Sequence, residues 1–127
     1  MTGPDRLRVA VLDDDQLVRT AIGRLLSASG MATELFATSL ELFDFLADGE
    51  FDCLILDYQM PGMNGLDVLD LLDRARARFP TLVMTAHDRP DVCDACLKAG
   101  AFAYLRKPLD AGELLVTIAN AVAARRS

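Results

Sequence analysis

The chain has 127 residues, of which 52% are hydrophobic, and a formal net charge of -6 at pH 7. This length fits one domain with a sizeable core, because a chain of this size removes about two-thirds of its unfolded surface from water. No apolar block approaches the roughly 18 residues that span a bilayer, and the net acidity disfavours direct binding to nucleic acid or anionic membranes. We therefore expect a soluble protein and, without a signal-peptide pattern, a cytoplasmic one.

Short apolar runs alternate along the chain with longer segments of helical period. The runs predict five strands, at Leu7–Leu12, Ala32–Phe36, Cys53–Leu56, Thr81–Thr85 and Ala103–Arg106. Consecutive parallel strands require crossover connections, and the helical segment between each pair of strands can supply one. The sequence therefore predicts a single α/β domain with helices on both faces of a mostly parallel sheet.

The helical segments carry signals for where they begin and end. The first places apolar residues at three-to-four spacing from Leu17 and is closed by Gly30, a residue that tolerates the left-handed conformation. Thr38 with Glu41 three residues later is a capping-box pattern for the second helix. Asn64 can cap the third helix in the same way, through its side-chain oxygen.

The third helix is expected to continue until Pro80 forbids it. Pro90 suits the first turn of a fourth helix, and Asp110 with Glu113 opens a fifth that runs almost to the C-terminus. The third helix would then include three arginines. We interpret them as solvated helix surface: Arg74, Arg76 and Arg78.

Polar side chains follow four of the five predicted strands, at the edge where ligands bind in open α/β sheets. Asp13 and Asp14 follow the first strand, Asp57 follows the third, Thr85 ends the fourth and Lys107 follows the fifth. Two carboxylates about 4 Å apart repel by roughly 4 kcal/mol at an effective dielectric of about 20, so a hard divalent metal is expected. Acids, a hydroxyl and an ammonium on one rim suggest phosphoryl transfer to a carboxylate.

With these residues assembled, the chain resembles the receiver domain of two-component response regulators, over about Leu7 to Ala124. Five motifs in the family's order carry the resemblance: Asp13-Asp14-Asp15, Leu56 to Gly65, Val83 to Ala86, Lys98 to Ala101, and Tyr104 to Pro108. It implies a five-stranded parallel sheet in the order 2-1-3-4-5, with five helices on two faces. The whole chain, 1–127, would be one receiver domain with a core at about 7–124 and no output domain.

The resemblance also assigns roles at the site. Asp57 would accept a phosphoryl group from a histidine kinase or phosphotransfer protein, or slowly from small phosphodonors. Mg²⁺ would be bound directly by Asp14 and Asp57, mainly through water by Asp13, and by the backbone carbonyl of Gln59. This oxygen set is what Mg²⁺ prefers. Lys107 would pair first with Asp57 and then with a phosphoryl oxygen.

A switch is implied as well. The Thr85 hydroxyl would move to a phosphoryl oxygen, and Tyr104 would turn inward behind it, changing the surface of the fourth helix, fifth strand and fifth helix. That surface would bind a downstream effector. The exposed part of the fifth helix, which is rich in Ala and Leu, could support a homodimer, although most of that stripe is core. The Lys107-Pro108 bond would be cis.

Several residues also have ordinary structural interpretations. Asp15 is better explained as a cap for the first helix than as part of the site. Tyr104 can be a packed or partner-facing aromatic instead of a moving switch, and His87 an exposed loop histidine. The cysteines are odd in number and fit no disulfide framework, so we interpret them as small packing residues: Cys53, Cys93 and Cys96.

Two other functions compete with the phosphorylated switch. The first is an interaction module that has the receiver fold and works without phosphorylation; such proteins usually lose an acid, the threonine or the lysine, and this chain has them all. The second is a haloacid-dehalogenase-type phosphatase, which also places a nucleophilic Asp after a parallel strand. That family needs a second acid two residues later, where this chain has Gln59.

Overall fold

Five strands alternate with five helices in the computed structural model, which describes residues 6–87 and 89–126. The strands are β1 (Arg8–Leu12), β2 (Ala32–Phe36), β3 (Cys53–Asp57), β4 (Thr81–Thr85) and β5 (Ala103–Arg106). The helices are α1 (Gln16–Ala28), α2 (Ser39–Leu46), α3 (Gly65–Arg74), α4 (Pro90–Lys98) and α5 (Ala111–Arg126). The five predicted strands are therefore confirmed.

The strands form one parallel sheet in the order β2-β1-β3-β4-β5, as the resemblance implied. Leu12 at the end of β1 lies opposite Leu56 of β3, and Asp57 lies opposite Met84 of β4. Because β1 and β3 are neighbours in register, the residues that follow them emerge side by side. The strand order thus brings acids that are far apart in the sequence to one edge.

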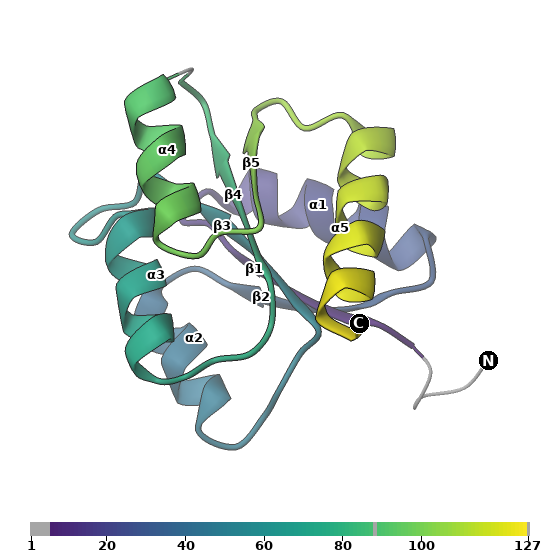
Figure 1. Ribbon diagram of the computed structural model, residues 1–127. Coiled ribbons are helices and arrows are strands. Elements are labelled where there is room, and N and C mark those ends of the chain that lie inside the picture. The colour runs from purple at the N-terminus through teal and green to yellow at the C-terminus, as the bar shows by residue number, and fades with distance from the viewer. Residues whose placement is uncertain (1–5, 88, 127) are drawn as a thin grey trace.

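Helices cover both faces of the sheet, with α1 and α5 on one face and α2, α3 and α4 on the other (Figure 1). Alternate strand residues feed two separate cores: Val9 and Val11 pack with α1 and α5, whereas Ala10 and Leu12 pack on the opposite face. The central strands β3 and β4 are buried along their whole length, as parallel strands between helix layers are. Within the described residues no helix is long and apolar enough to span a membrane.

Side-chain caps fix where the helices begin, and the predicted capping residues are confirmed: Asp15, Thr38, Asn64 and Asp110. Asp15 accepts hydrogen bonds from the first-turn N–H groups of α1, which confirms its structural interpretation. Thr38 and Glu41 form the predicted capping box. Pro90 occupies the first turn of α4.

The predicted extension of α3 to Pro80 is wrong, because the helix ends at Arg74. Arg76 then adopts a left-handed φ of 58°, and the backbone N–H of Ala77 returns to the carbonyl of Leu72 at 3.0 Å. This is the hydrogen bond of a Schellman C-cap. Two of the three arginines assigned to this helix therefore lie in the loop that follows it.

We expect Arg76→Gly to stabilise the protein. A non-glycine residue in the left-handed region costs roughly 1–2 kcal/mol, and glycine removes this cost. Glycine also increases the chain entropy of the unfolded state, which opposes the gain, so the net stabilisation is about 0.5–1 kcal/mol. Gly30 and Gly100 already occupy the equivalent positive-φ positions after α1 and α4. Urea denaturation measures the change, and Arg78→Gly, at a position without positive φ, should not stabilise. Equal effects of the two substitutions would contradict the C-cap explanation.

The three cysteines are free, and they pack as the sequence predicts. Cys53 and Cys96 are buried, and burial raises the pKa of Cys53 to about 12 and of Cys96 to about 11. Cys93 is half-buried. The thiols of Cys53 and Cys96 therefore stay protonated at neutral pH and behave as small apolar groups.

Candidate functional site

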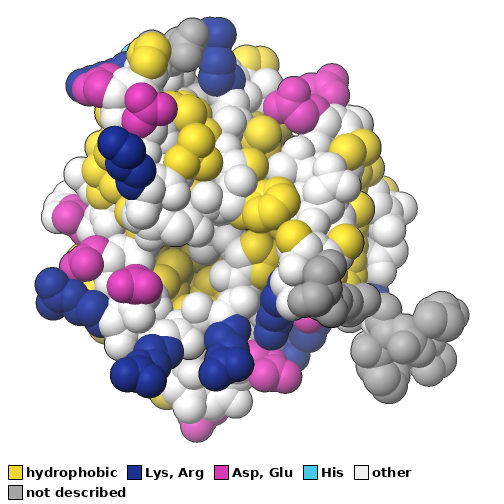
Figure 2. Space-filling model, viewed as in Figure 1, with side chains coloured by type: hydrophobic (Ala, Val, Ile, Leu, Met, Phe, Trp, Pro, Cys, Tyr) yellow, Lys and Arg dark blue, Asp and Glu magenta, His cyan; other side chains and the backbone are white. Residues whose placement is uncertain are grey.

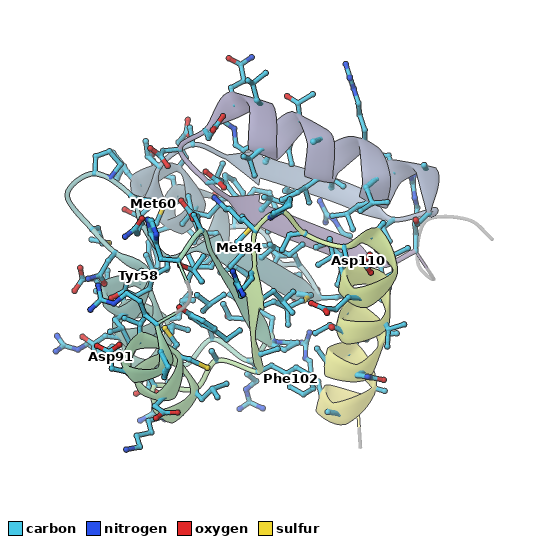
Figure 3. The ribbon with its side chains drawn as sticks, turned by 90° about the horizontal axis from the view of Figure 1, so that it is seen from above. Tyr58, Met60, Met84, Asp91, Phe102 and Asp110 are labelled. Atoms are coloured by element: carbon cyan, nitrogen blue, oxygen red, sulfur yellow. The ribbon has the colours of Figure 1, made fainter. Side chains whose placement is uncertain are left out.

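The site lies at the carboxyl edge of the sheet. Asp57 ends β3, and the chain directly after it is tied to β4 by a hydrogen bond from the N–H of Tyr58 to the carbonyl of Met84, at 2.9 Å. Seen from above, Tyr58 and Met60 in the loop after β3 lie on one side of Met84, and Asp110 at the start of α5 lies on the other (Figure 3). The loops after β3 and β5 thus approach the same edge from opposite sides.

Three carboxylates meet at this edge. Asp13, Asp14 and Asp57 each offer one oxygen, and these oxygens lie within 4.8 Å of one another. Among the described residues this is the one cluster of three metal-binding side chains, so His87 and the cysteines form no such group. Asp13 and Asp57 are buried and Asp14 is exposed. An all-oxygen, strongly acidic set that is open on one side fits Mg²⁺.

Lys107 lies between two of the acids. Its Nζ is 3.0 Å from Asp57 Oδ1, which confirms the predicted pair, and also 3.0 Å from Asp13 Oδ2, which the sequence did not indicate. Burial lowers the pKa of Lys107, but the hydrogen bonds and negative charges of Asp13 and Asp57 raise it by more, so the net pKa is raised. The backbone N–H of Lys107 donates to the Thr85 carbonyl at 2.7 Å, and the bond to Pro108 is cis, as expected.

Burial also governs the acidity of Asp57. It raises the pKa of this carboxyl from 3.8 to about 6, and the hydrogen bond from Lys107 only partly opposes it. The negative charges of Asp13 and Asp14 push in the same direction as burial. A nearby cation would offset both the cost of burying the charged carboxylate and the repulsion between the acids. The site therefore favours the binding of positive charge.

Asp13 is held at every polar atom. Its N–H donates to the Phe36 carbonyl at 3.2 Å, and its carboxylate accepts from the Asp15 N–H at 2.9 Å and from Lys107. Its carbonyl accepts from Arg19 Nη1 at 2.7 Å. Because both carboxylate oxygens already have protein donors, Asp13 suits a water-mediated contact to a metal better than a direct one. Arg19 is a residue of this site that sequence reasoning missed.

The residues assigned to the switch lie on the neighbouring strands β4 and β5. Thr85 is buried at the end of β4, and its hydroxyl accepts from the His87 N–H at 3.2 Å. The Tyr104 hydroxyl is buried and makes no hydrogen bond to any described residue. Its burial raises the pKa of Tyr104. The side chains of His87 and Gln59 are exposed, in agreement with a loop position for His87.

This fold, with an acid cluster and a lysine at the carboxyl edge of a five-stranded parallel sheet, defines the class of receiver domains. The model of the response regulator receiver domain family matches residues 9–119. The chain belongs to that family, the receiver domains of two-component systems.

Two relatives that match this sequence are longer than this chain. The transcriptional regulator NtrC of Escherichia coli K12 is 34% identical over 114 residues, which cover 90% of this chain and 24% of NtrC. The response regulator MprA of Mycobacterium avium is 40% identical over 109 residues, covering 86% of this chain and 48% of MprA. The chain therefore spans about a quarter to a half of these relatives.

Solved structures agree with the fold. A receiver domain protein from Clostridium thermocellum is 30% identical with a TM-score of 0.87, covering 94% of this chain and 97% of that one. The beryllofluoride-activated NtrC4 receiver domain, described as a dimer, is 25% identical with a TM-score of 0.87, covering 93% of this chain and 98% of that one. Both match the receiver domain nearly from end to end.

Proposed function

We propose that this receiver domain takes a phosphoryl group onto Asp57 from a phosphohistidine, carried by a histidine kinase or a phosphotransfer protein. The observation that carries the proposal is the placement of a buried carboxylate among two further acids, 3.0 Å from an ammonium. Asp14, Asp57 and the Gln59 carbonyl would bind Mg²⁺ directly, and Asp13 through water. When bound, Mg²⁺ neutralises charge on the transferring phosphoryl oxygens.

The chain's own residues account for the rest of the transfer. A carboxylate oxygen of Asp57 attacks phosphorus in line, the bond from phosphorus to the histidine nitrogen breaks, and an acyl phosphate forms. The ammonium of Lys107 shifts from the carboxylate to a phosphoryl oxygen. The Thr85 hydroxyl donates to another phosphoryl oxygen, giving up its present role as acceptor for His87. The domain would catalyse only its own phosphorylation and dephosphorylation.

The output is binding through the surface of α4, β5 and α5. Movement of Thr85 would leave space beside the Tyr104 hydroxyl, which is buried and has no hydrogen-bond partner among the described residues. Movement of Tyr104 into this space would couple the site to α4 and β5. Hydrophobic side chains gather between α4 and α5 on this face (Figure 2). The exposed hydrophobic residues of this region are Leu97, Phe102 and Val116. The partner is an effector protein, an output domain outside residues 1–127, or a second copy in a homodimer.

The input partner would dock at α1 and the loop after β5, the surface that this family commonly uses. An apolar cavity of about 540 Å³ opens there between α1 and the start of α5. Its apolar lining is Val18, Ala21, Ile22, Leu25, Pro108, Leu109 and Leu114. Leu17, which precedes Val18 in the chain, is 82% exposed. The proposal places the protein in the cytoplasm, with no membrane contact and no direct nucleic-acid binding by this domain.

The test is intact mass after incubation with acetyl phosphate. With Mg²⁺ we expect one added phosphoryl group, about 80 Da, on the protein and on the control Asp94→Asn. No adduct is expected in EDTA or on Asp57→Asn. Uptake by Asp57→Asn equal to that of the unmodified protein would refute this site. No uptake at all, with Mg²⁺ binding verified and rapid hydrolysis ruled out, would favour the phosphorylation-independent module.

A further inference from the structure

We infer that Arg19 is a positioning residue for the metal site: it fixes the peptide that joins Asp13 to Asp14 and thereby sets where the Asp14 carboxylate stands. This inference rests on the proposed function, in which Asp14 binds Mg²⁺. The carrying observation is the hydrogen bond from Arg19 Nη1 to the Asp13 carbonyl, at 2.7 Å, across six positions of the chain.

The placement of Arg19 is unusual for a cation. It lies one turn into α1, whose cap is Asp15, and its own N–H donates to the Asp15 carbonyl at 3.0 Å. The N-terminal end of a helix carries partial positive charge and disfavours a cation. The guanidinium of Arg19 lies near the N-terminal end of α1 and therefore needs a favourable contact to offset the dipole. The structure shows one such contact, the hydrogen bond to the Asp13 carbonyl.

The choice of acceptor points to positioning, not charge neutralisation. Acidic residues flank Arg19 at Asp13, Asp14 and Asp15, yet among the described residues its guanidinium forms no ion pair with any of them. It donates instead to a neutral backbone oxygen at short distance, in a partly buried position. Such a bond fixes the orientation of a peptide plane without lowering the negative charge of the carboxylates.

Asp14 depends on this bond more than its neighbours do. The carboxylate of Asp13 is held by Asp15 and Lys107, and that of Asp57 by Lys107. The exposed Asp14 carboxylate has no hydrogen bond or ion pair to a described residue, so its position follows from its backbone alone. Releasing the Asp13 carbonyl would let the Asp14 carboxylate move, and the metal would have to restrain it on binding.

The sign of the effect on Mg²⁺ separates this role from simple electrostatics. Arg19→Met removes a positive charge close to the acids, which by charge alone would tighten the binding of a cation. Loss of positioning acts in the opposite direction and weakens binding. Groups that orient metal ligands typically contribute 10- to 100-fold to affinity, so we expect the Kd for Mg²⁺ to rise about tenfold.

The experiment is calorimetric titration of the full chain with Mg²⁺. Arg19→Met should weaken binding about tenfold, Arg19→Lys, which keeps one donor, should lie between, and the control Arg24→Met, exposed on the same helix, should match the unmodified protein. Hydrogen exchange without metal should show the N–H groups of residues 13–15 less protected in Arg19→Met. If Arg19→Met does not fold, Arg19→Lys and its intermediate Kd decide the question.

An unchanged or lower Kd in a folded Arg19→Met would overturn the inference, as would a fall in Tm without a change in Kd, which describes a merely structural arginine. The unmodified protein is measured first. If it binds no Mg²⁺ and takes up no phosphoryl group, the proposed function fails. If it does both and the Arg19 variants bind Mg²⁺ equally well, only the positioning role fails.

Discussion

Lys107→Met should lower the free energy of unfolding by about 3 kcal/mol at neutral pH without Mg²⁺. The ammonium pairs at 3.0 Å with both Asp13 and Asp57, and both carboxylates are buried. Removing it leaves two buried negative charges without compensation, and breaking a buried pair by deleting one partner is strongly destabilising. Chemical denaturation in EDTA measures the loss.

Two conditions should restore much of that stability. Mg²⁺ supplies the missing positive charge, and lowering the pH protonates Asp57 and removes one of the unpaired charges. The pKa of Asp57 is about 6 with Lys107 present, and loss of the ammonium should raise it further. The control Lys98→Met lies exposed at the end of α4 and should change stability little under any of these conditions. A loss in Lys107→Met that neither Mg²⁺ nor acid reduces would show that the cost comes from packing and not from charge.

The same substitution should slow phosphorylation of Asp57 by acetyl phosphate about 100-fold at saturating Mg²⁺, because one preorganised positive group is lost from the transferring oxygens. Mg²⁺ binding itself should be tighter than in the unmodified protein, since the site becomes more negative. The combination of tighter metal binding and slower transfer is specific to a residue that acts on the phosphoryl group. Equal rates would remove Lys107 from the proposed mechanism.

Asp57→Asn should raise the free energy of unfolding by about 1–3 kcal/mol at neutral pH in EDTA. The pKa of Asp57 is raised to about 6 in the folded protein against 3.8 ordinarily, first by burial and then by the neighbouring acids. When the pKa of an acid is higher in the folded state than in the unfolded state, ionisation of that acid makes the folded protein less stable. Asparagine is neutral and close in shape to the protonated acid, so the variant avoids the cost of burying an ionised carboxylate.

The advantage of Asp57→Asn should depend on pH with a defined sign. Below about pH 4 the carboxyl is protonated in both states, so the two proteins should differ little. Between about pH 4 and 6 the unfolded chain has ionised while the folded carboxyl still holds its proton, so the unmodified protein loses stability relative to the variant, and the difference is complete above about 6. Asp14→Asn, which removes an exposed acid from the same cluster, should give a smaller gain. A pH-independent difference would contradict the raised pKa.

Much of the site could be predicted from the sequence because parallel strands bring their ends to one edge. Asp57 directly follows an apolar strand, as Asp13 does, and strand neighbours in register bring these acids together. The sequence did not show that Lys107 is shared. It places Lys107 on the same edge, but which carboxylate an ammonium reaches depends on side-chain positions that strand order leaves open.

Two other features lay outside what patterns show. The end of α3 carries no glycine, so the left-handed turn at Arg76 had no signal and only Pro80 was visible as a stop. The position of Arg19 did carry a signal in the sequence, because a basic residue in the first turns of a helix is disfavoured by the helix dipole and this one follows an acid cluster. Its partner is a backbone carbonyl, which no side-chain motif records.

The two cores of the sheet also bear on how such a domain can change over evolutionary time. The cavity proposed for the input partner is built on α1 and α5, whereas Tyr104 packs into the opposite core with α2, α3 and α4. Under the proposed function, substitutions on α1 that alter the choice of phosphodonor would therefore leave the packing behind Tyr104 intact, and changes around α4 would leave the donor cavity intact. Upstream and downstream partners could then change separately through α1 and α4, with α5 as the element that both surfaces share and the acid edge unchanged between them.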